Sequence, residues 1–293
     1  MASLVRPGGT GRLAIVAGWG QLPLYLAEAA RSAGEDPVVV ALANEADRSF
    51  ASFETLNTGV GDLAGIERFL REKGVGRVVM SGAVRRRPEW REIRPTLKTL
   101  VRVPAVVRTL LSGGDDAVLQ MVIRLFEGMG CQVLGAQEIA PNLLARTGTL
   151  TTVAPSAEDL TDIAKGMEAA LALGTLDVGQ GAVCVGGRVV ALEGVEGTDG
   201  MLERVATLRD EGRISRRRRG VLVKLCKPQQ DIRADLPAIG ISTVTNAARA
   251  GLAGIAVEAG RALVLDEQAV IAAAEDAGLF VCGIDTALPR GGL

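Results

Sequence analysis

The segment Lys224–Gly240 contains the residue types of a catalytic loop. It reads KLCKPQQDIRADLPAIG and follows a short apolar run at 220–223. Its two prolines exclude an ordinary helix or a central strand, because each removes an amide donor and restricts the residue before it. Alternating carboxylates and cations suit such a loop to hold a divalent metal ion beside an anionic substrate. A solvated polar loop without chemistry is the alternative interpretation.

The sequence contains no histidine, which restricts the chemistry available to it. Ser-His-Asp catalysis, Cys-His catalysis and HExxH zinc sites are all excluded. The four cysteines form no CxxC pair, and we expect them to be reduced and mostly buried thiols. A metal ion would therefore lie among oxygen ligands, which favours Mg²⁺, Mn²⁺ or Ca²⁺.

The composition is typical of a tightly packed α/β protein. Of 293 residues, 48% are hydrophobic, only 3% are aromatic and 37 are glycine. The net charge of −1 gives no overall attraction to nucleic acid, so we expect no nucleic-acid partner. The basic run Arg216–Arg219 is typical of a solvated surface and is also suited to a phosphate-rich membrane face. No signal peptide or membrane span is expected, which predicts a cytoplasmic location.

The N-terminal half has the alternation of strands and helices that builds a parallel sheet. Short apolar runs bounded by glycine predict strands, and segments with helical spacing between them predict helices. The predicted strands are 13–17, 37–42, 76–81 and 132–135, and the predicted helices are 22–33, 61–73, 96–111 and 115–128. This order predicts a Rossmann-like domain over residues 12–139.

The C-terminal half predicts a second α/β domain. Residues 140–155 show no convincing period and are the expected linker, and residues 156–288 are the expected catalytic domain. The predicted strands are 181–185, 188–192, 220–223, 254–257 and 262–265, and the predicted helices are 156–174, 199–208, 242–250 and 267–278. Because these strands follow one another closely, we expect a mixed sheet. Ser156 and Asp159 predict a capping box for the first helix.

Glycines after the first predicted strand are placed as in a dinucleotide-binding fingerprint. The segment Gly18-Trp19-Gly20 lacks the third glycine, and no acidic residue ends the second strand, so the fingerprint is incomplete. The turn is still suited to present the amides of Gly18 and Gly20 to an anion or a uracil-type ring. A tight turn that needs glycine for its geometry explains the same residues. The arginines of 82–90 are suited to bind phosphate or to lie in a surface loop.

Polar side chains also gather where strands of the C-terminal domain begin or end. Gln180 precedes one predicted strand, and Glu193 and the turn at 196–199 follow the next. In that turn, Thr198 or Asp199 is suited to cap a helix. A carboxylate cluster would form if the sheet brought these ends close to the loop at 230–235. Such a cluster without histidine suits Mg²⁺-assisted pyrophosphate chemistry.

Three motifs carry a resemblance to a known family: EGTD at 196–199, KPQQDIRADLPAIG at 227–240 and AGLAGIAVEAG at 250–260. The chain resembles the LpxI-type UDP-2,3-diacylglucosamine pyrophosphatases of lipid A synthesis. The resemblance extends from LAIVAGWGQLP at 13–23 to GLFVCGID at 278–285. It implies a Rossmann-like N-terminal domain and a C-terminal domain of a fold peculiar to the family. It also implies Mg²⁺-dependent hydrolysis of UDP-2,3-diacylglucosamine to UMP and 2,3-diacylglucosamine 1-phosphate (lipid X).

The resemblance assigns roles to residues of this sequence. The essential acid of the family matches Asp235, and Asp231 is the second catalytic candidate. Asp235 and Asp199 are the predicted metal ligands. The predicted substrate-binding residues are Gly18, Gly20, Gln180, Thr198, Lys227, Gln230 and Arg233. The side chains of Lys224, Lys227 and Arg233 are also suited to stabilise the growing negative charge of the phosphates.

The implied partner is a lipid-linked UDP-sugar, bound by a protein peripheral on the inner membrane, with a homodimer as an open alternative. Two other functions remain compatible with the sequence. One is a nucleotide-dependent oxidoreductase that uses the Rossmann-like domain, against which the incomplete glycine fingerprint argues. The other is a non-enzymatic lipid-binding or regulatory protein built on the same scaffold.

Overall fold

The computed structural model describes residues 10–84 and 115–287. The chain forms two compact units. The N-terminal unit comprises Met1–Pro141 together with Asp231–Asp235, and the C-terminal unit comprises Asn142–Gln230 and Leu236–Leu293. The helix predicted at 96–111 and most of the arginine-rich segment at 82–90 lie outside the described residues.

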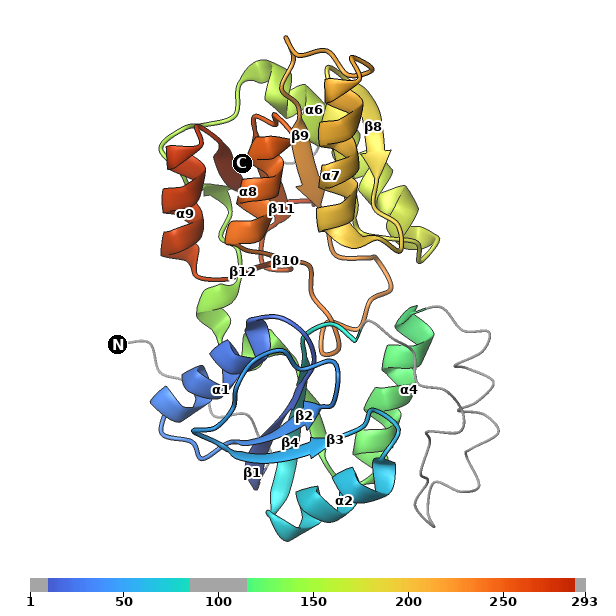
Figure 1. Cartoon of the computed structure of the whole chain (residues 1–293), viewed down its shortest axis with the longest axis vertical. Helices are drawn as coiled ribbons and strands as arrows, with labels where there is room; N and C mark the ends of the chain where they lie inside the picture. The colour runs from blue at the N-terminus through green and yellow to red at the C-terminus, as the bar shows by residue number, and fades with distance from the viewer. Residues whose placement is uncertain (1–9, 85–114, 288–293) are drawn as a thin grey trace. The chain divides into compact units, whose positions relative to one another are not determined.

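The N-terminal unit contains a five-stranded parallel sheet in the order β3-β2-β1-β4-β5 (Figure 1). Its strands are β1 Arg12–Ala17, β2 Val38–Leu42, β3 Glu54–Thr58, β4 Val75–Ser81 and β5 Gln132–Leu134. Its described helices are α1 Leu22–Ser32, α2 Leu63–Glu72, α4 Asp115–Gly128 and the short α5 Ala136–Ile139. The predicted Rossmann-like α/β class is confirmed.

Alternation along the strands divides the side chains of this sheet between two faces. On one face, Ala14 and Val16 of β1 pack with Ile66 of α2 and with Ile123 and Phe126 of α4. Helix α1 contacts β1 and β4, and it packs beside α5. All five residues of β2 are buried, as expected for a parallel strand covered on both faces.

The C-terminal unit contains a six-stranded mixed sheet in the order β6-β13-β11-β9-β7-β8. Its strands are β6 Gly148–Thr149, β7 Gly181–Val185, β8 Arg188–Leu192, β9 Val221–Lys224, β11 Gly254–Glu258 and β13 Phe280–Ile284. The central strands β9, β11 and β13 are parallel, whereas β7 is antiparallel to both of its neighbours and β6 is antiparallel to β13. A separate pair of short parallel strands is formed by β10 Ala238–Ile239 and β12 Leu263–Val264. The predicted mixed sheet is confirmed.

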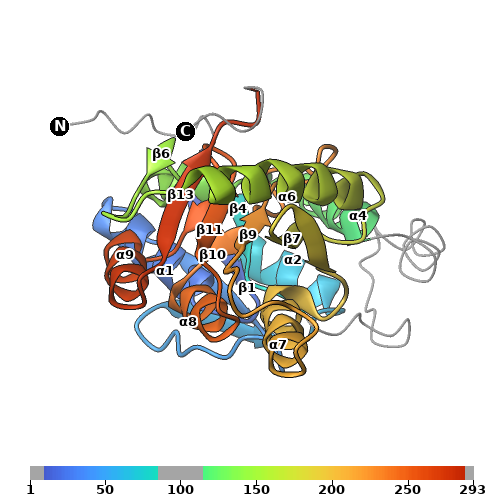
Figure 2. The ribbon, with the colours of Figure 1, turned by 90° about the horizontal axis from the view of Figure 1, so that it is seen from above.

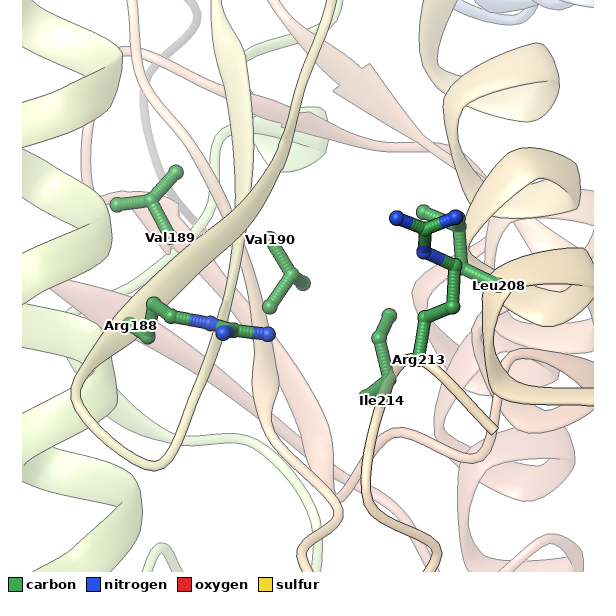
Figure 3. Close-up of a pocket in the computed structure, with 6 residues that line it drawn as sticks. All are labelled: Arg188, Val189, Val190, Leu208, Arg213 and Ile214. Carbon is green, nitrogen blue, oxygen red and sulfur yellow. The ribbon is translucent and has the colours of Figure 1, made fainter. Parts of the chain in front are cut away.

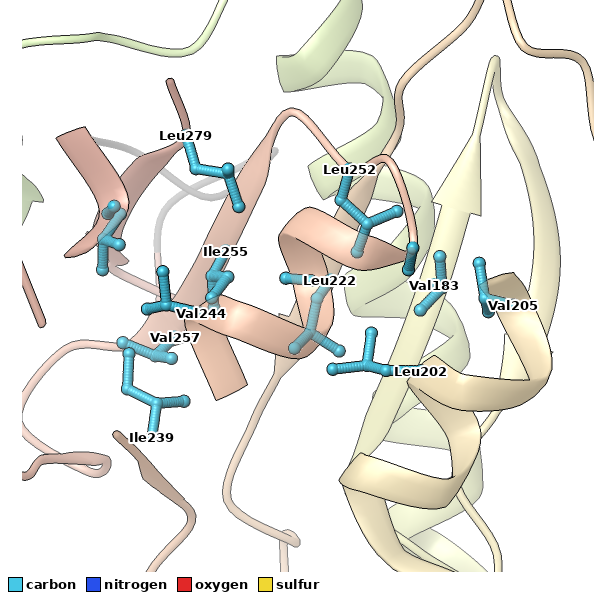
Figure 4. Close-up of a cluster of buried hydrophobic side chains, with 14 of the residues drawn as sticks. Val183, Leu202, Val205, Leu222, Ile239, Val244, Leu252, Ile255, Val257 and Leu279 are labelled. Carbon is cyan, nitrogen blue, oxygen red and sulfur yellow. The ribbon is translucent and has the colours of Figure 1, made fainter. Parts of the chain in front are cut away.

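Helices cover both faces of this sheet, as Figure 2 shows. Helix α6 (Ala157–Thr175) lies on one face, and α7 (Gly197–Asp210), α8 (Ile241–Arg249) and α9 (Glu267–Asp276) lie on the other. Under the second group, aliphatic side chains of the strands pack against the helices in the cluster drawn in Figure 4. Val183 and Leu222 of the sheet are fully buried in it with Leu202 of α7. Each such side chain contributes roughly 1.5–3 kcal/mol by its burial.

Several local predictions can be compared with these elements. The capping box of α6 is present, with the Ser156 and Asp159 side chains each bonded to the other's backbone amide. The predicted cap of α7 is wrong, because this helix begins at Gly197 and both Thr198 and Asp199 lie in its first turn. The predicted linker at 140–155 contains β6, whose two residues are too few to show a period.

All four cysteines, Cys131, Cys184, Cys226 and Cys282, are buried and free, as predicted. Burial, with a smaller effect from Asp162, raises the pKa of Cys184 to about 12. Burial also raises the pKa of Cys282 to about 12. These two thiols stay protonated at neutral pH and are poor nucleophiles. None of the helices in the described ranges is long and apolar enough to cross a bilayer.

Candidate functional site

Buried polar side chains gather at one edge of the C-terminal sheet, which we call the carboxyl edge. Strands β8, β9, β11 and β13 all end there, and β7 begins there. The residues at this edge that are less than a tenth exposed are Glu193, Lys224, Gln230, Thr243 and Glu258. Buried polar groups cost free energy unless they are partnered, so this concentration marks the candidate site.

Glu193, directly after β8, organises the first part of the site. Its Oε1 accepts a hydrogen bond of 2.6 Å from the Thr198 hydroxyl, and its Oε2 accepts one of 3.4 Å from the main-chain amide of Gln180. The structure therefore brings together two predicted substrate-binding residues. The side-chain Oε1 of Gln180 is buried and has no hydrogen-bond partner within the described parts of the chain. An unpaired buried acceptor costs about 1–3 kcal/mol, which a ligand donor would recover.

Asp199 lies beside Thr198 in the first turn of α7, but its side chain is exposed. Its Oδ1 accepts a hydrogen bond of 2.9 Å from the side-chain amide of Asn246 on α8. The site thus has an exposed carboxylate next to the hydrogen-bonded pair of buried Glu193 and half-buried Thr198. Its predicted role as a metal ligand stays a prediction.

Lys224 is the last residue of β9, and its side chain is buried with only 7% of the residue exposed. Its ammonium donates a hydrogen bond of 3.1 Å to the Ala238 carbonyl. Within the described ranges 10–84 and 115–287, no carboxylate lies within 4.0 Å of it to form a salt bridge. Burying an ammonium without a counter-charge is costly, so this position suits an anionic ligand.

The other two predicted cations are both paired with acids. Lys227 forms a salt bridge of 2.7 Å with Asp177, and Arg233 forms one of 2.7 Å with Asp231 and another of 3.1 Å with Glu127. The sequence predicts that all three cations stabilise phosphate charge, and it assigns only Lys227 and Arg233 to substrate binding. The structure separates Lys224 from the other two by the absence of an acidic partner among the described residues.

Lys227 and Gln230 shape the start of the loop after β9. The Gln230 side-chain oxygen accepts a hydrogen bond of 3.2 Å from the Lys227 amide and lies 3.6 Å from the Cys226 sulfur. Glu258, at the end of β11, accepts one of 2.9 Å from the Cys226 amide. These contacts fix the turn, and a substrate-binding role for Lys227 and Gln230 stays a prediction.

Glu258 was not singled out from the sequence. Besides Cys226, it accepts hydrogen bonds from Arg261 at 3.3 Å and from Thr286 at 3.1 Å. The signal that could have found it is a single acid at the end of an otherwise apolar buried strand. Its contacts tie the ends of β9, β11 and β13 together.

The segment Asp231–Asp235 belongs to the N-terminal unit. The Asp231 carboxylate accepts three hydrogen bonds from Arg233, through the amide at 3.1 Å, Nε at 3.0 Å and Nη2 at 2.7 Å. The side-chain hydrogen bond from Arg233 is the main cause that lowers the pKa of Asp231, and the same bond raises the pKa of Arg233. Asp231 is therefore ionised at neutral pH, and both of its carboxylate oxygens are bonded to Arg233. Its predicted catalytic role stays a prediction.

Asp235 is half-buried in the same segment. Its amide donates a hydrogen bond of 3.4 Å to the Asp231 carbonyl, and Ala234 before it packs against the apolar core of the N-terminal unit. This anchoring fixes the backbone that carries the predicted essential acid.

The three main-chain amides of the glycine turn after β1 all donate hydrogen bonds within the protein. The amides of Gly18 and Trp19 donate hydrogen bonds of 2.8 Å to the carbonyls of Ser81 and Ala83, which lie at the end of β4 and just after it. The Gly20 amide donates one of 2.8 Å to the Asp47 carboxylate. The two glycine amides that were predicted to face a ligand are thus used internally.

Packing explains why this turn contains glycine. A Cβ on Gly18 would lie 2.6 Å from the Ala83 carbonyl oxygen. Gly20 has a φ of +107°, which side chains rarely adopt. The tight-turn interpretation accounts for both glycines, and their predicted substrate-binding role stays a prediction.

The two predicted metal ligands, Asp199 and Asp235, are carboxylates, which are among the oxygen donors that Mg²⁺ prefers. No group of three or more acidic or cysteine side chains lies close enough to hold a metal ion within the described residues. Mg²⁺ in nucleotide-processing enzymes usually takes one or two carboxylates and completes its shell with water and substrate phosphates. Asp235 in the N-terminal unit and Asp199 in the C-terminal unit each offer such a carboxylate.

Known proteins resemble the chain along nearly its whole length. The family description "LpxI N-terminal domain" matches residues 12–143, and "LpxI C-terminal domain" matches residues 146–282. A protein of Caulobacter vibrioides, UDP-2,3-diacylglucosamine pyrophosphatase LpxI, is 43% identical over 276 residues, which cover 94% of this chain and 98% of that protein. A solved UDP-glucose 4-epimerase of Thermus thermophilus with NAD aligns over 92% of this chain and 84% of its own. That alignment has 14% identity and a TM-score of 0.30, which is too low to support an argument.

Proposed function

The chain belongs to the LpxI family, and from this premise we propose that it hydrolyses the pyrophosphate bond of UDP-2,3-diacylglucosamine. The resemblance based on the sequence motifs is confirmed by the match of both family domains. The observation that carries the proposal is the 43% identity over 94% of the chain to a relative with that name. The proposed products are UMP and 2,3-diacylglucosamine 1-phosphate.

Residues at the carboxyl edge are suited to bind the diphosphate. In hydrolysis, a water oxygen bonds to one phosphorus while the bridging P–O bond breaks and its electron pair leaves with the other phosphate. Negative charge on that leaving oxygen grows during the step, and the buried Lys224 ammonium would neutralise it. The Gln180 Oε1 at the same edge would accept a hydrogen bond from a sugar hydroxyl or the uracil N–H of the substrate, with Thr198 beside it.

Asp235 is the proposed essential acid. Its carboxylate would hold Mg²⁺ or accept the proton of the attacking water, and Asp199 is the second proposed metal ligand. When bound, Mg²⁺ would offset phosphate charge and orient the reacting groups. Two guanidinium hydrogen bonds to Asp231 hold Arg233 in one orientation, and the remaining N–H groups of Arg233 would contact a phosphate.

The proposed substrate implies a place of action. A lipid with two acyl chains resides in a membrane, so the protein would work peripherally at the cytoplasmic face of the inner membrane. A homodimer remains a prediction from the sequence.

The test is phosphorus NMR of the products formed in ¹⁸O-labelled water. We expect UMP and 2,3-diacylglucosamine 1-phosphate, with the isotope shift on one of them identifying the phosphorus that is attacked. Excess EDTA should stop the reaction, and added Mg²⁺ should restore it. An unchanged substrate would refute the proposed function, whereas full activity in EDTA would refute only the role of an exchangeable metal.

The structure gives the oxidoreductase alternative no support. A dinucleotide pyrophosphate requires free amides at the first glycine turn, but the three amides of this turn are donated within the protein. Turnover of the lipid substrate distinguishes the proposal from a non-enzymatic lipid-binding protein.

A further inference from the structure

A second region of the C-terminal unit, opposite to the carboxyl edge, is rich in arginine. We call it the arginine edge and define it by six exposed residues: Arg188, Arg213, Arg216, Arg217, Arg218 and Arg219. Arg188 begins β8, and the others lie between α7 and β9. Helix α7 begins at the carboxyl edge and ends here, and its 14 residues span about 20 Å. The arginine edge is therefore separate from the candidate site.

The arginines of this edge differ from other arginines of the same unit in their pairing. Elsewhere in the unit, arginines on or near the helices form salt bridges with glutamates: Arg146–Glu267, Arg204–Glu196, Arg249–Glu203 and Arg261–Glu258. Among the described residues of the arginine edge, only Arg216 reaches an acid, Asp210, at 3.4 Å.

Four side chains at this edge, those of Arg188, Arg213, Arg217 and Arg218, have no hydrogen bond or salt bridge to any part of the chain that the structure describes. A chain with a net charge of −1 thus concentrates arginine side chains without salt-bridge partners in the described residues at one edge. Such a concentration attracts anions over several ångströms of solvent.

Buried groups hold the backbone of this edge in place. The guanidinium of the buried Arg209 donates hydrogen bonds of 2.7–2.9 Å to the carbonyls of Ser215, Arg218, Arg219 and Ala250. The buried Asp162 carboxylate accepts hydrogen bonds from the amides of Gly186 and Gly187 in the turn between β7 and β8. The arginine side chains therefore extend from a fixed backbone, which lowers the entropy that a ligand must overcome.

A cavity of about 520 Å³ opens between β8 and the end of α7. Figure 3 shows Arg188, Val189 and Val190 on one side of it and Leu208, Arg213 and Ile214 on the other. Two cations thus border four aliphatic side chains. A smaller cavity of about 240 Å³ lies nearby between Arg217–Arg219 and the start of α6, where Glu158, Asp159 and Asp162 are its acidic members.

We propose that the arginine edge binds the surface of a bilayer containing anionic phospholipids. The unpaired guanidinium groups would contact lipid phosphates, and the aliphatic wall between Arg188 and Arg213 would contact the apolar part of a lipid. The lining favours lipid over nucleic acid, because the described residues that line the two cavities include no aromatic side chain on which a base could stack. This contact would keep the protein near a membrane-embedded substrate and leave the carboxyl edge uncovered.

The test is co-sedimentation of the full chain with vesicles, which requires no turnover and is independent of the proposed function. We expect binding to vesicles of phosphatidylcholine with phosphatidylglycerol, little binding to phosphatidylcholine alone, and weaker binding as salt is raised. Each arginine near an anionic surface contributes about fivefold in affinity, so Arg217→Gln with Arg218→Gln should weaken binding roughly 25-fold. Arg188→Gln with Arg213→Gln should have a similar effect.

The matched control is Arg204→Gln with Arg249→Gln, which removes the same charge from paired positions on α7 and α8. It should leave vesicle binding within about twofold of the wild type, because these charges lie outside the arginine edge. Circular dichroism checks that each variant is folded. Equal binding to neutral vesicles, equal losses in the control, or binding to a DNA duplex without binding to anionic vesicles would overturn the proposal.

Discussion

The carboxyl edges of the two sheets differ, although both are positions where parallel sheets usually bind ligands. In the N-terminal unit, the loops after β1 and β4 are joined by main-chain hydrogen bonds between Gly18, Trp19, Ser81 and Ala83. In the C-terminal unit, the corresponding edge holds buried side chains, and among them Lys224 has a carbonyl but no described acid as its partner. Amides that are already paired cannot cradle a phosphate, whereas a buried uncompensated charge favours one.

The difference indicates that the two carboxyl edges have different roles. The glycine turn of the N-terminal unit packs two loops together, whereas the carboxyl edge of the C-terminal unit holds the buried charged side chains. The predictions below test this difference through activity for Asp235 and Lys224 and through stability for Gly18 and Asp231.

The largest expected effect is that of Asp235→Asn. If this carboxylate is the essential acid, its loss should lower kcat by roughly 10³-fold or more while the protein stays folded. Steady-state rates on UDP-2,3-diacylglucosamine measure the loss, and thermal melting checks the fold. Asp210→Asn, at the end of α7, is the matched control and should keep normal activity. Near-normal rates of the Asp235 variant would show that the Asp235 carboxylate takes no part in the reaction.

Lys224→Met should lower kcat/KM by about 10²-fold, because the phosphates would lose a buried positive charge. Its melting temperature should be unchanged or higher, since the substitution removes a buried charge that has no described acidic partner. Lys165→Met removes an exposed ammonium that is paired with Glu168, and it should change neither quantity appreciably. A variant that loses stability but keeps its kcat/KM would show that Lys224 is structural.

Gly18→Ala should destabilise the protein by about 2–3 kcal/mol while the folded fraction keeps its kcat, because the new Cβ would press on the Ala83 carbonyl. Urea unfolding measures the change. Gly34→Ala is the comparison, since Gly34 has a φ of +84° but nothing within 4 Å of its added Cβ. That substitution should cost only about 1 kcal/mol of backbone strain. An equal cost at both positions would contradict close packing at the glycine turn.

Asp231→Asn should have the smallest effect, below about 1 kcal/mol at neutral pH, because its partner Arg233 is partly exposed. Arg233 lowers the folded-state pKa of Asp231, so this stabilisation is present above the unfolded pKa of about 3.9. It is lost as the pH falls through the lower folded pKa. Urea unfolding at pH 7 and near pH 3 should show a difference between wild type and variant that shrinks in acid. A difference that stays constant would exclude the ionised pair as its source.

Strands with continuous apolar runs, such as β2, β7 and β9, were predictable because burial on both faces requires them. The edge strand β3 was missed, since Glu54–Thr58 is only partly buried and its sequence, ETLNT, resembles a loop. Strand β13 was missed although it is fully buried, because Gly283 interrupts its apolar run. That glycine is required where the Arg146 carbonyl approaches the strand.

The candidate site was predicted in its residue types but not in its pairings. Lys224, Lys227 and Arg233 are equivalent in the sequence, and only the fold gives two of them acidic partners. The partner of Lys224 is a carbonyl of β10, a strand of two residues that no periodicity reveals. The Glu193–Thr198 contact likewise depends on where β8 ends relative to α7.

The membership of Asp231–Asp235 in the N-terminal unit has a consequence for anyone who wishes to express the two units separately. No single cut in the chain separates them, because five residues encoded in the second half complete the first. A fragment starting at Asn142 would carry Arg233 without Glu127 and Ala234 without its apolar neighbours. A fragment ending at Pro141 would lack the same five residues. Recombination that joined the first half of this gene to the second half of another would therefore separate the N-terminal unit from five of its own residues.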